Sequence, residues 1–260
     1  MIRYAVLGVV QGLTEFLPVS SSGHLAIAQR LLGLDPPGVL LEALLHWGTL
    51  AAVVWVFRAD LWEMIRSLTP RGSIEGRKEL GMIVAGTIPI VVVGLLLRPT
   101  IGAIFSSLEL VGASLLATAV LLALTAFVRH RAERNRARFA DALIVGVAQA
   151  VSVLPGISRS GATIAAGRFA GMTPSGAARF SFLLAVPALF GAGLVNLWDA
   201  LSAVGAQASW LGLLVGTATA FLVGLGAIKV LLAVVSRGRF WAFSIYCAIV
   251  GIAVLVGALV

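Results

Sequence analysis

Charged residues are scarce in this sequence of 260 residues: Asp, Glu, Lys and Arg make up only 12% of it, while 60% of the residues are hydrophobic. A typical soluble domain is about 25% charged and about 45–50% apolar. A soluble fold of this length could not bury so much apolar surface, so the composition indicates a protein dissolved in lipid. The only cysteine, Cys247, excludes an intrachain disulfide and is expected to be a small core residue.

Common nucleotide-binding and zinc-binding motifs are also missing. The sequence has no Walker loop, no dinucleotide-binding fingerprint and no spacing of Cys and His that suits zinc. The formal net charge is +8, but this excess does not predict a nucleic-acid partner, because the basic residues lie in the gaps between apolar runs. Membrane proteins use such basic loops to set their orientation.

Six apolar runs are long enough to cross a bilayer, which takes about 20 residues of helix. The loops after the first and third runs hold most of the Lys and Arg residues, so their side is predicted to be cytoplasmic and both termini extracytoplasmic. The runs are Leu40–Phe57, Leu80–Leu97, Leu108–Val128, Ala177–Trp198, Trp210–Leu232 and Trp241–Val260. The basic residues are Arg58, Arg66, Arg71, Arg77, Lys78, Arg129, Arg131, Arg134, Arg136 and Arg138, with Arg237 and Arg239 on the same side. We therefore expect a multi-pass protein of the cell membrane.

Two further apolar stretches are too short to span. Val6–Phe16 is interrupted by the polar segment Pro18–Gly23, and Ala142–Leu154 is interrupted by Pro155–Gly161. A short helix, a polar tip and a second short helix predict a re-entrant hairpin, which enters and leaves the membrane on the same side. Such backbone is tolerated only where protein or an aqueous cavity surrounds it.

The two hairpins are copies of each other. When Gly8 is aligned with Gly146, the segments that follow match without a gap as far as Pro36 and Pro174. The identical pairs are Gly8/Gly146, Val9/Val147, Gln11/Gln149, Ser20/Ser158, Ser22/Ser160, Gly23/Gly161, Ala28/Ala166, Arg30/Arg168, Gly33/Gly171 and Pro36/Pro174. The glycines Gly33 and Gly171 are expected to end the second helix of each hairpin.

The fold class that follows is an all-α polytopic membrane protein built from an inverted-topology repeat. Each half, about residues 1–130 and 139–260 of one membrane domain, has a re-entrant hairpin and three transmembrane helices. Three spans are an odd number, so the second half starts on the opposite side of the membrane. In such architectures the binding site lies near the midplane, at the broken helices where the repeats meet.

Ionisable residues within the hairpins are the first candidates for chemistry, because charge in a membrane is costly. Glu15 and Arg159 are charged, and His24 is titratable in the same setting. Gln11 lies four residues before Glu15 and shares its helix face. A buried structural ion pair between Glu15 and Arg159 is the alternative interpretation. His46 lies outside the hairpins and has only Glu42, one turn earlier, as an ionisable neighbour in the sequence, so it is expected to be structural.

The polar tips look suited to an anion. Each precedes a short helix and offers free backbone N–H groups, hydroxyl donors and a glycine, the features with which helix N-termini bind phosphate. Arg159 adds a planar cation that suits phosphate oxygens. The candidate phosphate-binding residues are Gln11, Ser20, Ser22, Gly23, Ser158, Ser160, Gly161 and Thr163. Ordinary N-capping explains one serine per tip equally well. A divalent cation, Mg²⁺ or Ca²⁺, fits Glu15 together with Gln11 but is not demanded.

At these motifs the chain resembles the undecaprenyl-diphosphate phosphatase family, also called the bacitracin-resistance family. The first motif, Gln11–His24, reads QGLTEFLPVSSSGH; the second, Pro155–Thr163, reads PGISRSGAT; and Phe180–Pro187 reads FSFLLAVP. The resemblance implies hydrolysis of a C55 isoprenyl diphosphate lipid, recycling of the carrier for peptidoglycan, and bacitracin resistance. It also implies catalytic roles for Glu15, Ser21, His24 and Arg159, stimulation by divalent cations, and a site that opens outward. Gln11 departs from the Glu of many members, which weakens a scheme with two carboxylates on one metal.

Three questions stay open at the level of sequence. The nucleophile could be Ser21, His24 or a water molecule. Inverted repeats with broken helices are also a transporter design, so a flippase of phosphorylated isoprenoid lipid is the competing class of function. A homodimer is compatible with the sequence but is not indicated by it.

Overall fold

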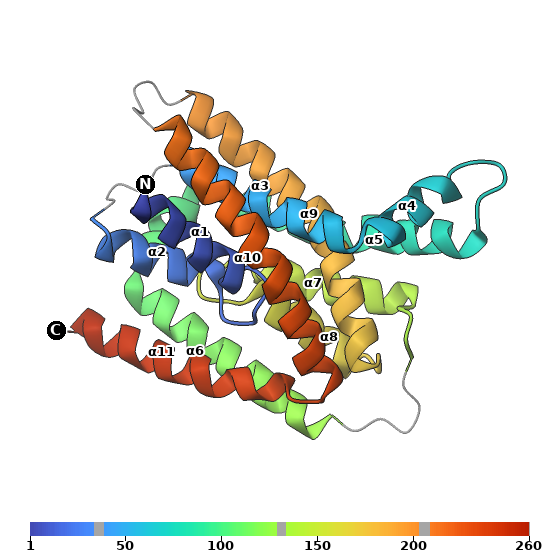
Figure 1. Ribbon diagram of the computed structural model, residues 1–260. Helices are drawn as coiled ribbons and strands as arrows, with labels where there is room; N and C mark the ends of the chain where they lie inside the picture. The colour runs from blue at the N-terminus through green and yellow to red at the C-terminus, as the bar shows by residue number, and fades with distance from the viewer. Residues whose placement is uncertain (34–38, 129–133, 203–208, 260) are drawn as a thin grey trace.

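The computed structural model describes residues 1–33, 39–128, 134–202 and 209–259, and within these ranges it is helical without a β-sheet (Figure 1). Pro36, Arg129, Arg131 and Val260 lie outside the described residues. The all-helical prediction is thus confirmed for the described part of the chain. The helices are α1 (Ile2–Thr14), α2 (Ser21–Leu31), α3 (Val39–Val56), α4 (Arg58–Ser67), α5 (Ile74–Ser106), α6 (Leu108–Leu124), α7 (Phe139–Val151), α8 (Arg159–Phe169), α9 (Pro174–Ser202), α10 (Trp210–Ser236) and α11 (Phe243–Leu259), with short 3₁₀ turns at Thr125–Phe127 and Phe240–Ala242.

Among the described residues, five helices are long and apolar enough to cross a membrane: the spans Ile74–Arg98, Leu108–Phe127, Pro174–Asp199, Trp210–Ser236 and Phe240–Ala258. A sixth is reached if α3 counts together with α4, which is bent away from it by 75°. The first predicted run therefore corresponds to a helix that ends in a sharp bend, and α4 projects from the body together with the start of α5 (Figure 1). The multi-pass helical membrane fold is confirmed.

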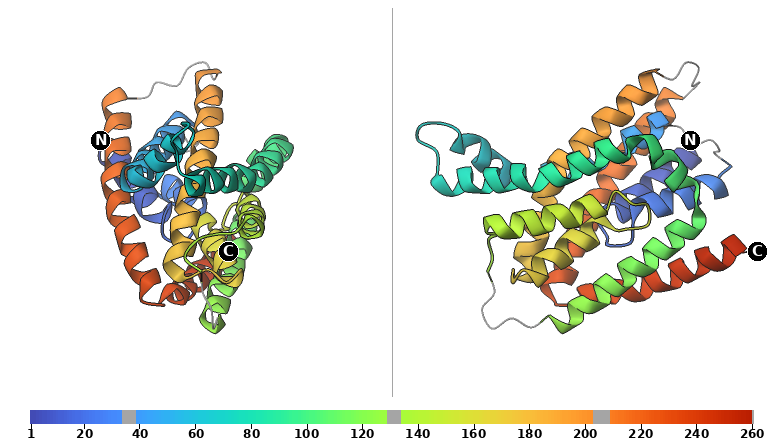
Figure 2. Two further views of the ribbon diagram at one scale, coloured as in Figure 1. Left: turned by 90° about the vertical axis from the view of Figure 1, so that its right-hand side faces the viewer. Right: turned by 180° about the vertical axis from the view of Figure 1, so that it is seen from behind.

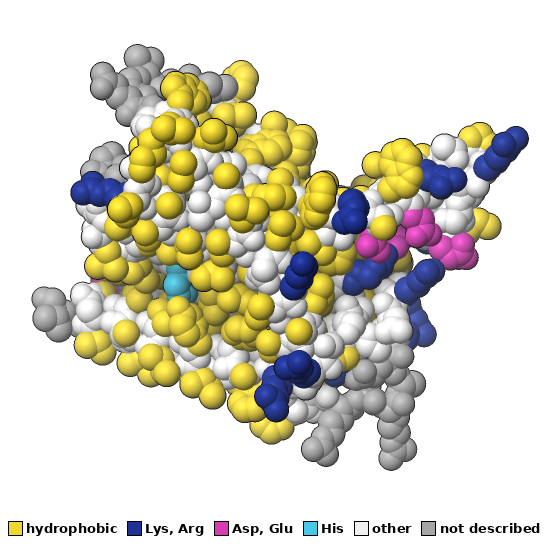
Figure 3. All heavy atoms as spheres, viewed as in Figure 1, with side chains coloured by type: hydrophobic (Ala, Val, Ile, Leu, Met, Phe, Trp, Pro, Cys, Tyr) yellow, Lys and Arg dark blue, Asp and Glu magenta, His cyan; other side chains and the backbone are white. Residues whose placement is uncertain are grey.

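The outer surface has the character expected of a protein in lipid. Large apolar side chains such as Leu96 of α5, Leu222 of α10 and Ile249 of α11 are more than half exposed. Hydrophobic side chains cover most of the face drawn in Figure 3, while Lys and Arg gather toward the side of the α4–α5 projection. This segregation of apolar and basic surface agrees with a membrane belt bordered by basic loops.

The second helices of the two hairpins begin and end at equivalent positions of the repeat, at Ser21–Leu31 and Arg159–Phe169. Both carry a serine N-cap: Ser20 Oγ accepts a hydrogen bond from the Gly23 N–H, and Ser158 Oγ accepts one from the Gly161 N–H. Both are followed by a glycine in the left-handed region, Gly33 with φ 64° and Gly171 with φ 89°. The predicted glycine stops are confirmed, because glycine adopts this conformation without strain.

Each hairpin packs against a long helix of the other half of the chain. A Cβ atom on Gly8 of α1 would lie 2.4 Å from the Gly216 carbonyl oxygen of α10, and one on Gly146 of α7 would lie 2.4 Å from that of Gly86 on α5. Small residues at these crossings allow the backbones to touch, as is typical of membrane helices. The same neighbours, α1 beside α10 and α7 beside α5, appear from other sides in Figure 2.

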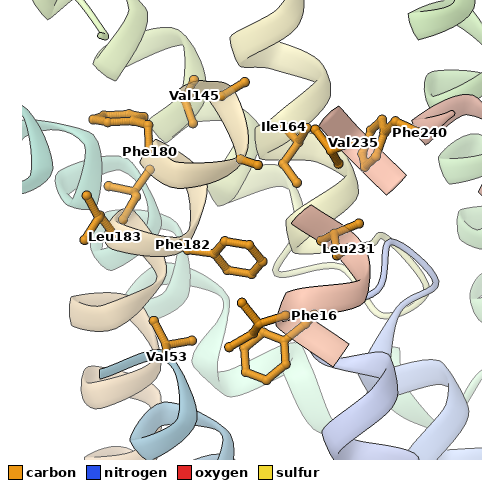
Figure 4. Packing of buried hydrophobic residues seen from close by; sticks show 14 of the residues in the cluster. Phe16, Val53, Val145, Ile164, Phe180, Phe182, Leu183, Leu231, Val235 and Phe240 are labelled. Carbon is orange, nitrogen blue, oxygen red and sulfur yellow. The ribbon is translucent and has the colours of Figure 1, made fainter. Parts of the chain in front are cut away.

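The turn between α1 and α2 lies in the largest hydrophobic cluster. Phe16 is fully buried there against Phe182 of α9, with ring centroids 5.9 Å apart, and near Val53 of α3 and Leu231 of α10 (Figure 4). Cys247 of α11 is also buried, and its Sγ donates a hydrogen bond to the Pro18 carbonyl oxygen. The prediction of a core cysteine is confirmed. Packing thus holds a polar hairpin turn in the middle of the protein.

Candidate active site

Glu15 terminates α1 and is almost completely buried, with 5% of its surface exposed. Gln11 lies one helical turn earlier on the same face, so its Nε2 donates to Glu15 Oε2 over 3.0 Å. A carboxylate at this depth requires several donors or a positive charge beside it. The remaining donors come from other segments of the chain.

Ser21 is brought to Glu15 by a tight turn. Its Oγ donates to Glu15 Oε2 over 2.7 Å, which makes the carboxylate a proton acceptor for this hydroxyl. The preceding residue, Ser20, has φ 70° and is the only non-glycine residue with positive φ in the described ranges. A non-glycine residue held in this region marks local strain, which is concentrated at functional sites.

Arg159 comes from the second hairpin as the first residue of α8. Its Nη2 lies 2.5 Å from Glu15 Oε1, and its side chain is 14% exposed. The two turns also touch directly: a Cβ atom on Gly23 would be 3.9 Å from Gly156 Cα, and one on Gly161 would be 3.4 Å from Pro18 Cβ. The internal repeat relates these two contacts, because Gly23 is equivalent to Gly161 and Pro18 to Gly156. The polar tips therefore meet, with the starts of α2 and α8 close together.

The other serines and the threonine organise the tips. Ser20 Oγ lies 3.3 Å from Ser22 Oγ, and Ser158 Oγ lies 3.3 Å from Ser160 Oγ. Thr163 Oγ1 donates to the Arg159 carbonyl oxygen and lies 2.5 Å from Ser181 Oγ of α9. N-capping thus accounts for Ser20 and Ser158. The hydroxyl of Thr163, one helical turn after Arg159, links α8 to α9.

The imidazole of His24 does not point toward Ser21 or Glu15. Its Nδ1 lies 2.8 Å from the Ser20 carbonyl oxygen, and its Nε2 lies 2.8 Å from the Tyr246 hydroxyl of α11. The two rings are stacked with centroids 5.7 Å apart. Both ring nitrogens are therefore engaged by groups other than Ser21 and Glu15, although His24 follows Ser21 closely in the sequence.

His46, which the sequence placed among structural residues, is the imidazole that faces Glu15. Its Nε2 lies 3.9 Å from Glu15 Oε2, and its Nδ1 lies 2.8 Å from the Glu42 carbonyl oxygen. The signal available in the sequence was a titratable side chain within a membrane helix, one turn after Glu42. Nothing in the spacing indicates that α3 passes beside the hairpin turn, so the contact with Glu15 could not be read from it.

The side chains of the site supply too few ligands to hold a metal ion unless substrate oxygens complete its coordination. No group of three or more His, Cys, Asp or Glu side chains that could hold a metal occurs in the described ranges. Gln11 Oε1 is nevertheless buried without a hydrogen-bond partner, next to the Glu15 carboxylate. Mg²⁺ commonly binds one or two protein oxygens together with substrate phosphates, so Gln11 and Glu15 fit such an ion.

The sequence is similar to known proteins over nearly its whole length. The sequence model of the family described as "Bacitracin resistance protein BacA" matches residues 4–253. A protein of Desulfosudis oleivorans named undecaprenyl-diphosphatase is 46% identical, over 96% of this chain and 96% of its own length. Proteins of the same name from Halothermothrix orenii and Korarchaeum cryptofilum are 43% and 42% identical, over 96% of this chain and 95% and 96% of their own lengths. The chain belongs to the bacitracin resistance protein BacA family.

Proposed function

We propose that this protein is a membrane phosphatase that hydrolyses undecaprenyl diphosphate to undecaprenyl phosphate and inorganic phosphate. Membership of the family and the names of the relatives support this activity. The observation that carries it is that Ser21 and Arg159, the first residues of two helices, both donate hydrogen bonds to Glu15. The reaction recycles the lipid carrier of peptidoglycan synthesis, and overproduction of the enzyme confers bacitracin resistance.

The diphosphate binds between the two tips. Helix N-termini carry free N–H groups and a partial positive charge, so α2 and α8 both favour phosphate oxygens at this place. Arg159 uses one N–H for Glu15, and a guanidinium has five, so donors remain for the phosphate. The apolar tail extends among the membrane helices, which keeps the leaving lipid phosphate in the bilayer.

Ser21 is the nucleophile that the contacts favour. Its Oγ gives its proton to Glu15 Oε2 as the Oγ–P bond forms. The bond between the terminal phosphorus and the bridging oxygen breaks, and undecaprenyl phosphate leaves with that electron pair. Water then attacks the phosphorus of the phosphoserine, the Oγ–P bond breaks as Oγ takes back the proton held by Glu15, and inorganic phosphate is released. His24 bonds to Ser20 and Tyr246, so its catalytic role requires its ring to turn toward the tip.

Trapping the covalent intermediate distinguishes the nucleophiles. Rapid acid quench with substrate labelled in the terminal phosphate should give phosphoserine at position 21, and none in Ser21→Ala. Label on His24 would move the nucleophile to the imidazole. An unlabelled protein in an active preparation would favour direct attack by water.

A divalent cation would be held by Glu15 and the free Oε1 of Gln11, with phosphate oxygens completing its shell. When bound, it supplies positive charge that offsets the charge of the diphosphate. Titration of the chelated protein with Mg²⁺ and Ca²⁺ tests this, because Gln11→Leu should raise the cation concentration required for half-maximal activity.

The architecture proposed for this activity is an inverted repeat with two re-entrant hairpins. Cross-bracing of the turns supports it: Thr118 of α6 donates to the Gly156 carbonyl oxygen of the second turn, while Cys247 of α11 donates to the Pro18 carbonyl oxygen of the first. Pro18 and Gly156 occupy equivalent positions of the two hairpins. Each turn is thus held by the last helix of the other repeat. In this arrangement both termini face outward and the site opens to the same side.

Phosphate release in detergent tests the function against the competing transporter. Without a closed membrane no gradient exists, so only an enzyme can produce phosphate from an isoprenyl diphosphate. Wild type should release it, and Glu15→Gln and Arg159→Lys should not. Movement of lipid phosphate across liposomes without hydrolysis would favour a flippase. A homodimer stays a prediction, which light scattering of the same preparation checks.

A further inference from the structure

We propose that His46 is a positioning residue of this active site, which holds the Glu15 carboxylate through its Nε2 atom and one bridging water. The inference rests on the proposed function and adds a residue on α3 that neither hairpin contains. Glu15 Oε2 lies 3.9 Å from His46 Nε2. This separation is too long for a direct hydrogen bond and suits a single water between two polar atoms.

The hydrogen bond of Nδ1 fixes the orientation of the His46 ring. The Glu42 carbonyl oxygen can only accept a hydrogen bond, so Nδ1, at 2.8 Å from it, carries a proton. The side chain of Glu42 is tied down in turn, because Gln29 Nε2 of α2 donates to its Oε1 over 2.8 Å. Nε2 is therefore the atom presented to Glu15, on a ring that is oriented within α3, while the Glu42 side chain separately links α3 to α2.

Glu15 needs this contact because phosphate competes for two of its other partners. In the present structure Arg159 and Ser21 donate to it. When phosphate binds, Arg159 shares its N–H groups between Glu15 and the phosphate, and Ser21 passes its proton to Glu15 as its Oγ attacks phosphorus. Gln11 and His46 then help to hold a carboxylate with 5% exposure in the geometry needed to take the Ser21 proton. A base misplaced by about 1 Å loses much of its rate advantage.

The test uses side chains that copy one ring nitrogen at a time. Gln places a polar atom where Nε2 lies, whereas Asn places one where Nδ1 lies and cannot reach Glu15. Leu removes both. For phosphate release in detergent, His46→Gln should keep kcat within about threefold of wild type, while His46→Asn and His46→Leu should lose at least tenfold. KM should change less than about twofold in all three, because the phosphate-binding tips are untouched.

Thr49→Val is the matched control on α3. In the described part of the chain its buried hydroxyl bonds only to the Leu45 and His46 carbonyl oxygens of its own helix, so its loss should leave kcat unchanged. Rescue by Asn and failure of Gln would show that position 46 serves only as an anchor to Glu42, and would overturn the proposal. Wild-type rates in Leu, or equal losses in Gln and Leu, would overturn it as well.

A second measurement does not depend on catalysis. Melting temperatures of wild type, His46→Leu, Glu15→Gln and the double variant form a cycle in which contact between the two side chains makes the shifts non-additive. Additive shifts would refute the contact even in an active enzyme. Non-additive shifts in a protein that releases no phosphate would instead refute the proposed function and leave the contact standing.

Discussion

Arg159 Nη2 and Glu15 Oε1 lie 2.5 Å apart, although 144 residues separate the two in sequence. Each belongs to a different hairpin turn, and both side chains are largely shielded, with 14% and 4% of their surface exposed. Breaking a buried ion pair on one side leaves an uncompensated charge, which is costlier than removing both partners. The pair therefore links the stability of the two hairpins to the chemistry of the site.

Replacing Arg159 should destabilise the protein more than removing the whole pair does. Arg159→Met leaves Glu15 charged and buried, so the free energy of unfolding should fall by about 3–5 kcal/mol. Adding Glu15→Gln should restore most of that loss without restoring phosphate release. Thermal unfolding in detergent measures the first effect, and a phosphate assay measures the second.

The exposed pair of Arg98 and Asp199 provides the control for this experiment. Their side chains are 51% and 45% exposed, so Arg98→Gln should cost less than about 1 kcal/mol. If Arg159→Met melted like Arg98→Gln, the buried pair would not hold the hairpins together.

Serines at the tips should separate into a catalytic one and capping ones. Ser21→Ala removes the hydroxyl that donates to Glu15, and should reduce kcat at least about 100-fold with little change in stability. Ser158→Ala removes an N-cap of α8, and should lower the free energy of unfolding by about 1 kcal/mol. Comparing kcat with melting temperature for both variants checks the division. A stable, fully active Ser21→Ala protein would contradict it.

Local signals in the sequence specify the hairpins well. Proline and glycine interrupt the apolar runs, serine caps the following helix, and glycine ends it, so the bounds of α2 and α8 follow from residues that act over one turn. The repeat presents the same pattern a second time. These features depend on backbone chemistry alone, which is why they could be predicted.

Contacts between helices that are distant in the sequence could not be predicted in this way. Ser21 and His24 are three residues apart, a spacing that places two side chains on one face of a helix, yet the His24 ring bonds to Tyr246, 222 residues away. His46 approaches Glu15 because α3 packs beside α9 and α10, and no periodicity in α3 reports that packing. The break between α3 and α4 falls at Phe57, where the predicted run ends, but nothing in the sequence indicates that the chain bends there by 75°. Tertiary packing decides all three.

Glycines at helix crossings should tolerate substitution according to the space beside them. A Cβ atom on Gly8 would meet the Gly216 carbonyl oxygen at 2.4 Å and Thr219 Cβ at 2.8 Å, so Gly8→Ala must separate α1 from α10. The expected loss is about 1–3 kcal/mol of unfolding free energy. A Cβ atom on Gly94 of α5 would meet no described atom beyond its own stretch of helix within 4 Å, so Gly94→Ala should instead gain up to about 1 kcal/mol from helix propensity. Thermal unfolding of the pair in one detergent compares them, and equal shifts would argue against close packing of α1 on α10.

Single cysteines should report which face of the membrane each loop occupies. Thr69 after α4, Ser236 at the end of α10 and Ser209 before α10 are exposed. The proposed topology puts the first two on the cytoplasmic side and Ser209 on the opposite side. Cys247 is fully buried, with its thiol bonded to the Pro18 carbonyl oxygen, so the unmodified protein should stay unlabelled and serves as the background. In intact cells an impermeant maleimide should label Ser209→Cys at once, and Thr69→Cys and Ser236→Cys only after permeabilisation. The reverse pattern would invert the orientation, and labelling of Thr69→Cys and Ser209→Cys from the same side would contradict the proposed inverted repeat, because an odd number of spans must lie between them.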